Sequence, residues 1–566
     1  MNIMEKMNKL REGINMNQKQ LKSLFKKALS IHQKGDFNLA QTMYKEIIQI
    51  DPEHSDAYHL LGQIQAQKGQ ENQAIESIQK AIKLYECDIY LNSLATIYLK
   101  QGFIHNACLC LRKALSKNSK FSDAYYSNLG LTLLHGGECV DAMNNFKKML
   151  ELKNDIPPLY SNYLMSLNYV PSMTDQQIYE EHLSFNNLFH LGQSYNKHLC
   201  LRPPRKKLRI GYVSSDFCRS SMTFFVEPVL RNHNYNKFEI FCYANVEQPD
   251  DVTHRIQLLE NQWIDTRLMT DEQMATKIMQ DRIDILVDLN GHFSGNRLAV
   301  FARQPAPIQV TYLGYPNTTG LSNMQYRLTD SIADPVDRDS YHSEKLIRLP
   351  SPFLCYQPVA DSPDVSSLPA KSNNYITLGS FNNLAKINNK LIFIWASILK
   401  KIPHARLLLK ARPFIDSKTQ ERFQKKFYKH GIQSDQIVFK PYDSKMAKHL
   451  MAYHDIDLAL DTFPYHGTTT TCDALWMGVP VVTLCGRCHA SRVGATILSA
   501  LGLTDFIAYS PKEYIDKTIY LCQNIHLLKN IRIQLRAIMQ TSALMDAKLQ
   551  THNIECAYNL MWSGNN

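Results

Sequence analysis

Four glycines recur at nearly equal spacing near the start of the chain. Gly35, Gly69, Gly102 and Gly137 are separated by 34, 33 and 35 residues. In each copy an alanine follows the glycine by five residues and a larger side chain follows the alanine by four: Ala40, Ala74, Ala107 and Ala142, then Tyr44, Ile78, Leu111 and Phe146. A small residue near a large one, once per copy, is typical of two closely packed helices. The spacing predicts stacked helical hairpins over residues 22–156.

The repeated unit resembles the tetratricopeptide repeat, including the Asp51-Pro52 pair that ends the first copy. Stacks of this kind bind peptides or proteins along one face, so the resemblance implies a surface for protein acceptors. We expect a polar segment before the array at residues 1–21. A helical connector is expected after it at residues 157–204.

Beyond residue 205 the pattern changes to short β-rich runs that alternate with helical segments. The first series comprises residues 208–213, 238–243, 283–289 and 308–313. The second comprises residues 376–380, 406–410, 436–439, 456–460, 481–484 and 506–508. This alternation predicts parallel sheets. We expect two Rossmann-like lobes, residues 205–370 and 371–566, with a ligand cleft at the carboxyl ends of their strands.

One stretch of the second series predicts a phosphate-binding turn, DTFPYHGTTTTCD at residues 461–473. A buried strand ends before it and a helix begins within it. Gly467 allows close approach of an anion to the backbone, while Thr468, Thr469 and Thr470 offer hydroxyls and first-turn amides at the positive end of the helix dipole. The alternative is an ordinary helix capped by threonine.

The composition is typical of a globular chain of several domains. Of its 566 residues, 44% are hydrophobic and 20% charged, and no apolar run approaches the ~18 residues that a membrane span requires. The net charge of +11 is spread along the chain. Its densest cluster, at residues 202–209, is interpreted as a solvated linker rather than a nucleic-acid site.

The expected compartment follows from the first residues and the cysteines. Residues 1–19 lack the apolar run of a secretory signal. The 13 cysteines mostly lie in apolar contexts, which favours reduced, buried thiols. Both features favour a cytosolic protein, in the producing cell or, if the chain is secreted as an effector, in a host.

Four long motifs in the two lobes are similar to those of one family. They are GYVSSDF at residues 211–217, RQPAPIQVTYLGYP at 303–316, GSFNNLAK at 379–386 and the stretch at 461–473. With the repeats, over roughly residues 22–562, the chain resembles the O-linked N-acetylglucosamine transferase family, specifically its bacterial SPINDLY-like branch. The resemblance implies a GT-B fold, a nucleotide-sugar donor used without a metal, and inverting transfer of the sugar to serine or threonine of proteins.

Within the third motif, Lys386 matches a family lysine that contacts the donor diphosphate and is needed for catalysis. One ammonium at the cleft can neutralise a leaving pyrophosphate, as Mg²⁺ does in other enzymes. The alternative for Lys386 is a solvated lysine at a helix start. Asn383 matches an amide that contacts the donor.

The remaining donor contacts are also implied by the resemblance. His449 corresponds to a histidine that stacks on the nucleotide base; from the sequence alone it would be a surface helix histidine. Asp473 corresponds to a ribose contact, and the three threonines at 468–470 to diphosphate contacts, although animal members carry a histidine where Thr468 stands. His466 stands where asparagine is expected, so its role is open.

The acceptor side is less well defined. His292 follows the strand at residues 283–289 and is therefore expected at the cleft, as an acid/base or acceptor-side residue. The alternative is a structural loop histidine. Ser220 stands where the resembling enzymes carry a histidine, and a serine cannot relay a proton near neutral pH as imidazole does.

Two short patterns are interpreted as structural. CGRCH at residues 485–489 matches a haem-attachment pattern but lies between a predicted strand and a helix, which favours an ordinary loop. Asp455 and Asp457 match the D-x-D pattern of metal-dependent glycosyltransferases. They precede a buried strand rather than follow it, so no metal site is expected there.

The resemblance thus implies a protein glycosyltransferase, with UDP-N-acetylglucosamine as the expected donor. Two alternatives stay open: another donor, GDP-fucose or UDP-glucose, or a scaffold whose lobes have lost turnover.

Overall fold

A computed structural model describes residues 18–117, 119–189, 206–259, 261–443 and 445–564. It divides the chain into two compact units, residues 1–133 and 134–566, which are described separately. Most of the predicted polar segment 1–21 and the end of the predicted connector, residues 190–204, lie outside the described residues. None of the described helices is long and apolar enough to cross a membrane.

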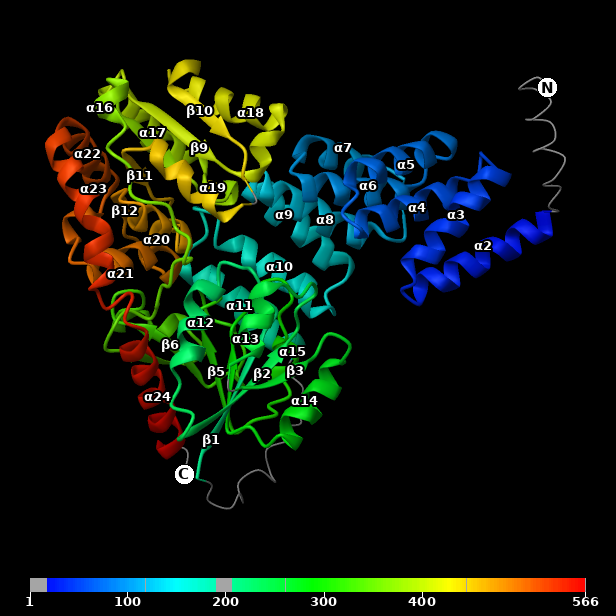
Figure 1. Cartoon of the computed structure of the whole chain (residues 1–566), viewed down its shortest axis with the longest axis horizontal. Helices are drawn as coiled ribbons and strands as arrows, with labels where there is room; N and C mark the ends of the chain where they lie inside the picture. The colour runs from blue at the N-terminus through cyan, green and yellow to red at the C-terminus, as the bar shows by residue number, and fades with distance from the viewer. Residues whose placement is uncertain (1–17, 118, 190–205, 260, 444, 565–566) are drawn as a thin grey trace. The chain divides into compact units, whose positions relative to one another are not determined.

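The first unit is an array of antiparallel helix pairs (Figure 1). Its helices are α2 (Gln18–Gln33), α3 (Phe37–Ile50), α4 (Ser55–Gln67), α5 (Glu71–Leu84), α6 (Asp88–Gln101), α7 (Ile104–Leu115) and most of α8 (Ser122–His135). Gly35, Gly69 and Gly102 turn the chain within each pair with φ of +86°, +74° and +94°, a left-handed conformation that favours glycine. The predicted helical repeats are confirmed.

The alanine and large residue of each copy pack as the repeat predicts. Ala40, Ala74 and Ala107 are fully buried, and so are Tyr44 and Ile78. Each alanine lets the second helix of its pair approach the first closely, and the larger side chain fills the space beside it.

The second unit begins with helices that lead into the lobes. These are α9 (Cys139–Leu152), α10 (Pro157–Leu167) and α11 (Asp175–Phe189). Gly137, at φ +80°, precedes α9, and a Cβ there would lie 2.8 Å from the backbone oxygen of Leu384. The Cys139 thiol donates to the carbonyl of Ala385 at 2.9 Å. The start of α9 is therefore fitted closely against the segment that carries Lys386.

The first lobe has a seven-stranded sheet in the order β3-β2-β1-β4-β5-β6-β7, with every described pairing parallel. Its strands are β1 (Leu208–Ser214), β2 (Phe238–Ala244), β3 (Asn261–Asp265), β4 (Ile285–Asp288), β5 (Ile308–Tyr312), β6 (Tyr326–Asp330) and β7 (Lys345–Leu349). Its helices are α12 (Thr223–Asn232), α13 (Asp251–Gln257), α14 (Asp271–Gln280), α15 (Leu298–Phe301) and the 3-10 helix η2 (Val336–Tyr341). The sequence pattern predicts β1, β2, β4 and β5 but not the other three strands.

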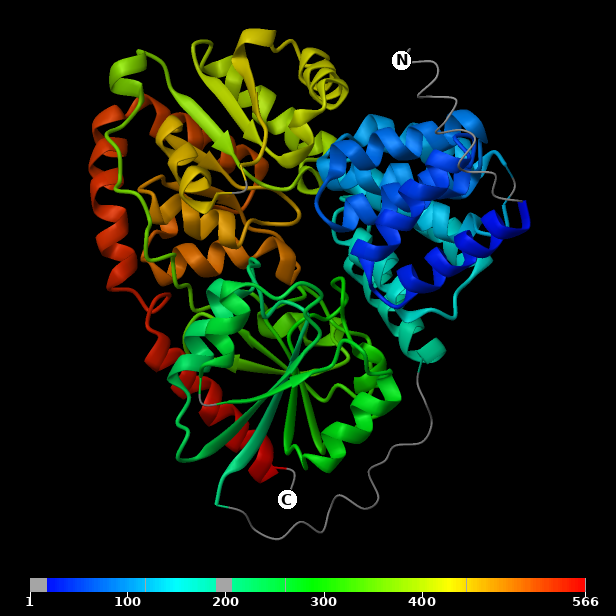
Figure 2. The ribbon, with the colours of Figure 1, turned by 45° about the vertical axis from the view of Figure 1, so that its right-hand side comes forward.

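The second lobe has a six-stranded parallel sheet in the order β10-β9-β8-β11-β12-β13. Its strands are β8 (Thr377–Ser380), β9 (Arg406–Lys410), β10 (Ile437–Lys440), β11 (Leu458–Leu460), β12 (Val481–Leu484) and β13 (Ile507–Ala508), all predicted to within a few residues. Figure 2 shows the two sheets as separate layers, each with helices beside it. The predicted fold class, a helical repeat array followed by two Rossmann-like lobes, is confirmed.

Helices of the second lobe connect these strands. They are α16 (Ala370–Asn373), α17 (Asn389–Lys401), α18 (Ser417–Tyr428), α19 (Met446–Met451), α20 (Thr469–Trp476), α21 (Val493–Ala500), α22 (Pro511–Gln523) and α23 (Ile525–Gln540). Short 3-10 helices are η3 (Leu384–Lys386), η4 (Arg412–Ile415), η5 (Ser434–Gln436), η6 (Ala452–Asp455), η7 (His489–Ser491) and η8 (Thr504–Phe506).

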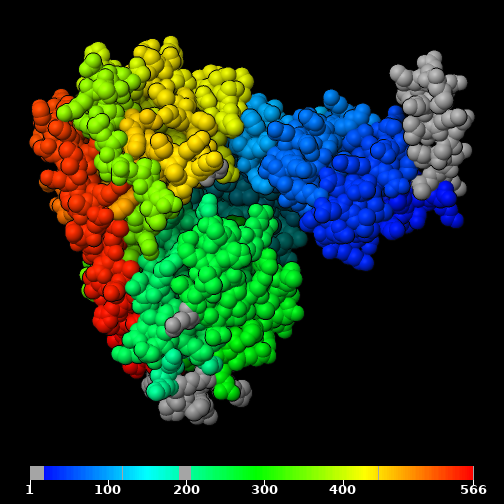
Figure 3. Space-filling model, in the orientation of Figure 1, coloured from blue at the N-terminus to red at the C-terminus, as the bar shows by residue number. Residues whose placement is uncertain are grey.

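The last helix, α24 (Ala547–Gly564), follows the second lobe in sequence but packs on the first. The hydroxyls of Tyr558 and Tyr212 lie 2.9 Å apart, and Glu555 lies 3.0 Å from His233 Nδ1. Figure 3 shows the helix, in red, along the green first lobe. The predicted division at residue 371 thus leaves out a helix that contributes to the first lobe.

Candidate active site

A cavity of about 490 Å³ lies at the carboxyl ends of strands from both sheets. The helical connector contributes Tyr169. The first lobe contributes Asp216, Ser221, Met222, Phe225, Phe293, Leu313 and Gly314. The second lobe contributes Asn382, Asn383, Lys386, Tyr465, Thr468, Thr469 and Thr470. Five predicted site residues therefore lie together: Asn383, Lys386 and the three threonines.

Lys386 ends η3 and extends toward the loop before α20. Its Nζ donates to the carbonyl of His466 at 2.6 Å and lies 4.1 Å from the ring centroid of Tyr465. Tyr169 stacks on Tyr465 with ring centroids 5.0 Å apart. Burial lowers the pKa of Lys386 to about 8, while the nearby Asp461 carboxylate acts in the opposite direction. The solvated lysine considered from the sequence is not what the structure shows.

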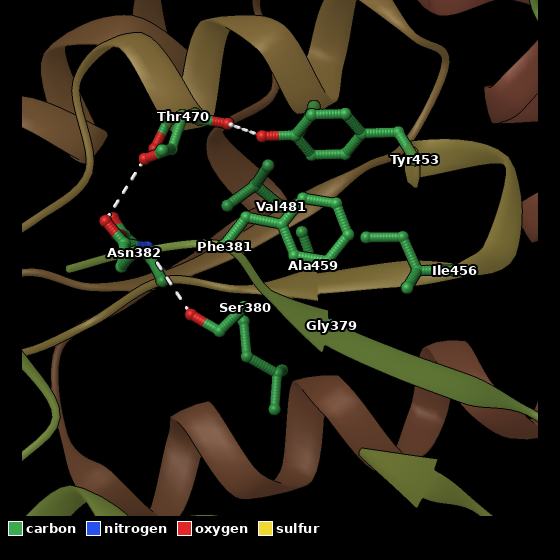
Figure 4. A pocket seen from close by; sticks show the side chains of 13 residues that line it. Gly379, Ser380, Phe381, Asn382, Tyr453, Ile456, Ala459, Thr470 and Val481 are labelled. Atoms are coloured by element: carbon green, nitrogen blue, oxygen red, sulfur yellow. Dashed lines mark hydrogen bonds between the residues drawn. The ribbon is translucent and has the colours of Figure 1, made fainter. Parts of the chain in front are cut away.

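The threonines begin α20. Thr468 precedes the helix, and its side chain makes no capping hydrogen bond to the helix. Thr469 Oγ1 lies 3.4 Å from the carbonyl of Ser221, in the first lobe. Thr470 Oγ1 donates to Asn382 Oδ1 at 3.1 Å, and its carbonyl accepts from Tyr453 (Figure 4). An ordinary threonine cap is therefore not formed, and the first-turn amides remain at the positive end of the helix.

Gly467 is required by the tight loop in front of α20. A Cβ there would lie 2.4 Å from Thr470 Oγ1 and 2.8 Å from Thr471 Oγ1. The N–H of Gly467 donates to Asp461 Oδ1 at 2.7 Å. This glycine thus lets the loop pack on the helix, and its own amide is directed to Asp461 rather than to a ligand in the cavity.

Asn383 begins η3, where its exposed side chain accepts from the N–H of Ala385 at 3.1 Å. This bond fixes the short turn that carries Lys386. Asn383 also lines the cavity, and its side-chain amide has an N–H donor besides the oxygen used in this bond.

His292 does not reach the cavity, which corrects the prediction for this residue. It is 1% exposed; Nδ1 accepts from Ser161 Oγ at 2.9 Å, and Nε2 donates to the carbonyl of Thr319 at 2.8 Å. Rings of His182, Phe185 and Tyr315 pack around it, and burial holds its pKa well below the ordinary value. With both nitrogens occupied, His292 joins α10 to the first lobe as a structural residue, the alternative considered from the sequence.

His449 and Asp473 are buried against each other and do not line the cavity of Lys386. His449 Nε2 lies 3.5 Å from Asp473 Oδ2, and Lys410 Nζ donates to His449 Nδ1 at 2.9 Å. Tyr356 donates to Asp473 Oδ1 at 2.7 Å. His449 is therefore not the surface histidine that its helix suggests; the polar network holds α19 beside α20.

Asp216, which the sequence analysis did not single out for chemistry, lines the cavity from the first lobe. It follows β1, and Asn290 Nδ2 donates to its Oδ2 at 2.7 Å. Burial raises the pKa of the carboxyl above its ordinary value. The sequence signal that predicts Asp216 at the cleft is its place just after a predicted strand. The same signal predicts His292 at the cleft.

Comparison with known proteins identifies the family. The model for glycosyl transferase family 41 matches residues 180–357 and 359–554, and a tetratricopeptide repeat model matches residues 32–96. The chain belongs to glycosyl transferase family 41. The resemblance predicted from the motifs is thereby confirmed at the level of the family.

Individual family 41 relatives agree with this result. The chain is 39% identical over 406 residues to a probable UDP-N-acetylglucosamine–peptide N-acetylglucosaminyltransferase SPINDLY of Solanum lycopersicum, over 71% of this chain and 44% of that protein. A probable UDP-N-acetylglucosamine–peptide N-acetylglucosaminyltransferase SEC of Arabidopsis thaliana is 35% identical over 371 residues, over 63% of this chain and 37% of that protein. The chain thus spans less than half the length of these relatives.

A solved structure matches nearly the whole chain. It is a mutant of the O-GlcNAc transferase of Thermobaculum terrenum, with a TM-score of 0.78 and 30% identity, covering 96% of this chain and 98% of that one. The match includes the repeats as well as both lobes of the family 41 fold.

The haem-attachment pattern at residues 485–489 and the D-x-D pattern of Asp455 and Asp457 both lie where they contact other parts of the fold. Residues 485–489 lead from β12 into η7, as the predicted loop does, and His489 Nδ1 lies 2.7 Å from Asp334 Oδ2 of the first lobe. Asp457 accepts from the N–H groups of Ala370 and Thr377 at the entry of β11. Asp455 pairs with Lys440 at 2.6 Å. These residues hold elements together away from the cavity.

Proposed function

We propose that the chain transfers a sugar from a nucleoside diphosphate sugar to serine or threonine hydroxyls of proteins, with inversion at the anomeric carbon. The observation that carries the proposal is one cavity lined by the Lys386 ammonium and the start of α20 from the second lobe, and by the Asp216 carboxylate from the first. An inverting displacement needs positive charge at the leaving group and a proton acceptor on the other side of the sugar.

The second lobe would hold the leaving diphosphate. Its charge grows as the bond to the sugar breaks, and the Lys386 ammonium, the threonine hydroxyls and the first-turn amides of α20 are donors that stabilise it. They supply the positive charge that a divalent cation supplies in other transferases. The contacts of His449 with the nucleotide base and of Asp473 with the ribose remain predictions. In the structure the two side chains contact each other, and Tyr356 donates to Asp473.

The first lobe would receive the acceptor proton. Asp216 is a carboxylate at the cavity whose pKa is raised by burial, which suits a base that takes a proton from a hydroxyl as the hydroxyl attacks. Met222, Phe293 and Leu313 give this side of the cavity an apolar surface. Exclusion of water by these side chains would favour the protein hydroxyl over hydrolysis.

UDP-N-acetylglucosamine is the first donor to test, since the names of the plant relatives contain it. Purified protein would be incubated with UDP-N-acetylglucosamine, UDP-glucose and GDP-fucose, and nucleotide release and self-glycosylation measured by mass spectrometry. We expect turnover with the first donor and its loss in Lys386→Ala. Binding without turnover of any donor would favour a scaffold, and turnover of another donor would change the sugar but not the reaction.

The repeat array would recognise the acceptor. Deleting residues 1–133, the first compact unit, should spare hydrolysis of the sugar nucleotide and lose transfer to protein. Deleting residues 1–156 should impair both, because it also removes Cys139 and its contact with Ala385 beside Lys386. Equal transfer to protein with and without residues 1–133 would contradict this role. The buried thiols suit a reducing compartment, and we place the reaction in the cytosol.

A further inference from the structure

A buried carboxylate lies behind the loop that carries the Lys386 contact. Asp461 follows β11 and is 2% exposed. Its Oδ1 accepts from the N–H groups of Thr462 at 2.8 Å and Gly467 at 2.7 Å. Its Oδ2 accepts from Thr483 Oγ1 at 2.7 Å. Three donors therefore converge on one buried carboxylate, and these hydrogen bonds offset the cost of burying it.

One peptide group connects this carboxylate to Lys386. The carbonyl oxygen of His466 accepts from Lys386 Nζ at 2.6 Å, and the N–H of the same peptide unit, on Gly467, donates to Asp461 Oδ1 at 2.7 Å. Because a peptide group is planar and trans, its N–H and carbonyl point in opposite directions. Asp461 therefore turns the carbonyl toward the ammonium; a reversed peptide would present an N–H to a cation.

The side chain of His466 holds the loop but carries no charge. Its Nε2 donates to the carbonyl of Leu484 at 2.9 Å, and its Nδ1 accepts from the N–H of Gly494 at 3.0 Å. Burial lowers the pKa of His466, so the ring is neutral near neutral pH. This pair of bonds accounts for the residue whose role the sequence left open.

The groups that contact Lys386 carry no charge, and the anionic group of the second lobe that acts on it is Asp461. Tyr465 and Tyr169 form a neutral aromatic stack beside it, and Asp216 lines the cavity from the first lobe. The pKa of Lys386 is lowered first by burial, and the Asp461 carboxylate acts against that shift.

We propose that Asp461 is a positioning residue for Lys386: it orients the His466–Gly467 peptide so that the carbonyl holds the ammonium, and its negative charge keeps that group protonated at neutral pH. The catalytic consequence rests on the function proposed above. The electrostatic coupling between the two residues does not, and it can be measured without turnover.

The test uses Asp461→Asn, which keeps the shape of the side chain and removes its charge. The probe is acetic anhydride, which acetylates only the neutral amine; the extent of labelling of Lys386 is measured by mass spectrometry as a function of pH. In the wild type we expect a midpoint near the pKa of about 8. An anion at short range changes a neighbouring pKa by about one unit or more, so the variant midpoint should fall by about one pH unit.

The pH profile of kcat/KM gives the matching readout. If transfer needs the ammonium, the alkaline limb should move to lower pH by the same amount in Asp461→Asn, a tenfold loss at pH values above both midpoints. A destabilising substitution without the coupling would reduce the amount of folded protein but would not move this limb. If the labelling midpoint of Lys386 shifts in Asp461→Asn but the wild type shows no turnover, the coupling between the two residues stands and only the proposed function is overturned.

Asp457→Asn is the matched control. Asp457 lies at the opposite end of β11, is also buried, and accepts two backbone N–H groups at 2.8 Å. Its substitution should lower the melting temperature without shifting the labelling midpoint of Lys386. If Asp461→Asn fails to fold, Asp461→Ser removes the same charge with a smaller side chain and should shift the midpoint in the same direction. An unchanged midpoint in the folded variant would overturn the proposal.

Discussion

The two walls of the cavity offer opposite chemistry. The second lobe presents hydrogen-bond donors: the Lys386 ammonium, threonine hydroxyls and the first turn of α20. The first lobe presents the Asp216 carboxylate among apolar side chains. Donors stabilise negative charge on a leaving group, whereas a carboxylate with a raised pKa accepts a proton. Because the two walls come from separate sheets, each can be disabled without dismantling the other.

The largest effect is expected on the second-lobe wall of the cavity, which carries the proposed site of the sugar donor and is called the donor wall below. Lys386→Ala should reduce kcat at least a hundredfold, because it removes a contact that costs ~3 kcal/mol of barrier when lost. The variant should remain folded, since the ammonium lies at the cavity rather than in the apolar core. Steady-state kinetics and a thermal melt of the same preparation test both points. Lys390→Ala, on the exposed start of α17, is the control and should retain wild-type kinetics.

Lys386 also predicts the alkaline limit of activity. Its pKa of about 8 means that the free enzyme loses the ammonium as pH rises through that value. The kcat/KM for the donor should therefore fall above pH 8, and the fall should be absent from the residual activity of Lys386→Ala. A flat profile up to pH 10 in the wild type would contradict the role of the ammonium.

The next largest effect is expected on the first-lobe wall of the cavity, which carries the proposed site of the acceptor and is called the acceptor wall below. Asp216→Asn should lower transfer to protein about a hundredfold, the size typical of a lost general base. Binding of UDP, measured by calorimetry, should change less than twofold, since the proposed diphosphate site lies on the other lobe. Asp251→Asn, which removes the exposed partner of Arg219, is a control on the same lobe. Equal transfer by Asp216→Asn and the wild type would exclude the carboxylate as the base.

His292→Ala should change stability rather than catalysis. The substitution leaves a cavity and removes the imidazole that hydrogen-bonds to the Ser161 hydroxyl and to the Thr319 carbonyl. The free energy of unfolding should therefore fall by about 3 kcal/mol. The kcat per folded molecule should stay within threefold. Urea unfolding and active-site titration with UDP separate the two quantities. A large loss of kcat in fully folded protein would return His292 to the chemistry.

The burial of His292 determines how its contribution to stability depends on pH. The folded-state pKa of His292 lies well below the ordinary value of 6.5, so the neutral ring contributes stability that is fully present above pH ~6.5. That stability is lost as pH falls further, because the unfolded chain binds the proton more readily. His292→Ala should therefore show a weaker dependence of unfolding free energy on pH between 6.5 and 4.

The sequence placed Asn383, Lys386 and the three threonines at the second-lobe wall of the cavity, but it also placed His449, Asp473 and His292 there, which the structure does not, and it missed Asp216. The reasons are physical. Loops after apolar strands are recognisable, and a glycine followed by threonines in such a loop has few uses other than a tight turn into a helix. Asp216 and His292 both follow strands of the first lobe. Which of them reaches the cavity depends on α10 and α11, because Ser161 and Phe185 enclose His292, and packing of that kind has no local sequence signal.

Two of the three strands missed in the first lobe, β3 and β6, have a related cause. β6 contains Arg327, which is 1% exposed, and the carbonyls of Tyr315 and Asn317 accept from its guanidinium. β3 reads NQWID, with no apolar run. Strand prediction relies on apolar or alternating patterns, so strands with polar side chains satisfied by tertiary contacts are not detected. That α24 packs on the first lobe is a tertiary contact, which likewise has no local sequence signal.

The smallest effect is expected from Ser220→His, the position where the resembling enzymes carry a histidine. Ser220 lines a neighbouring cavity of about 540 Å³ rather than the one that contains Lys386. Its hydroxyl donates to the carbonyl of Asp216 at 3.1 Å and lies 3.0 Å from Thr223 Oγ1. It therefore holds the loop that carries Asp216, and an imidazole there adds a titratable group without replacing the carboxylate. We expect kcat to change less than threefold, with the profile still limited by Asp216 at low pH. Ser220→Ala separates loss of the hydroxyl from gain of the ring. A rise of a hundredfold or more in Ser220→His, absent from Ser220→Ala, would mean that the acceptor wall of the natural protein lacks its base and that the lobes serve a binding scaffold.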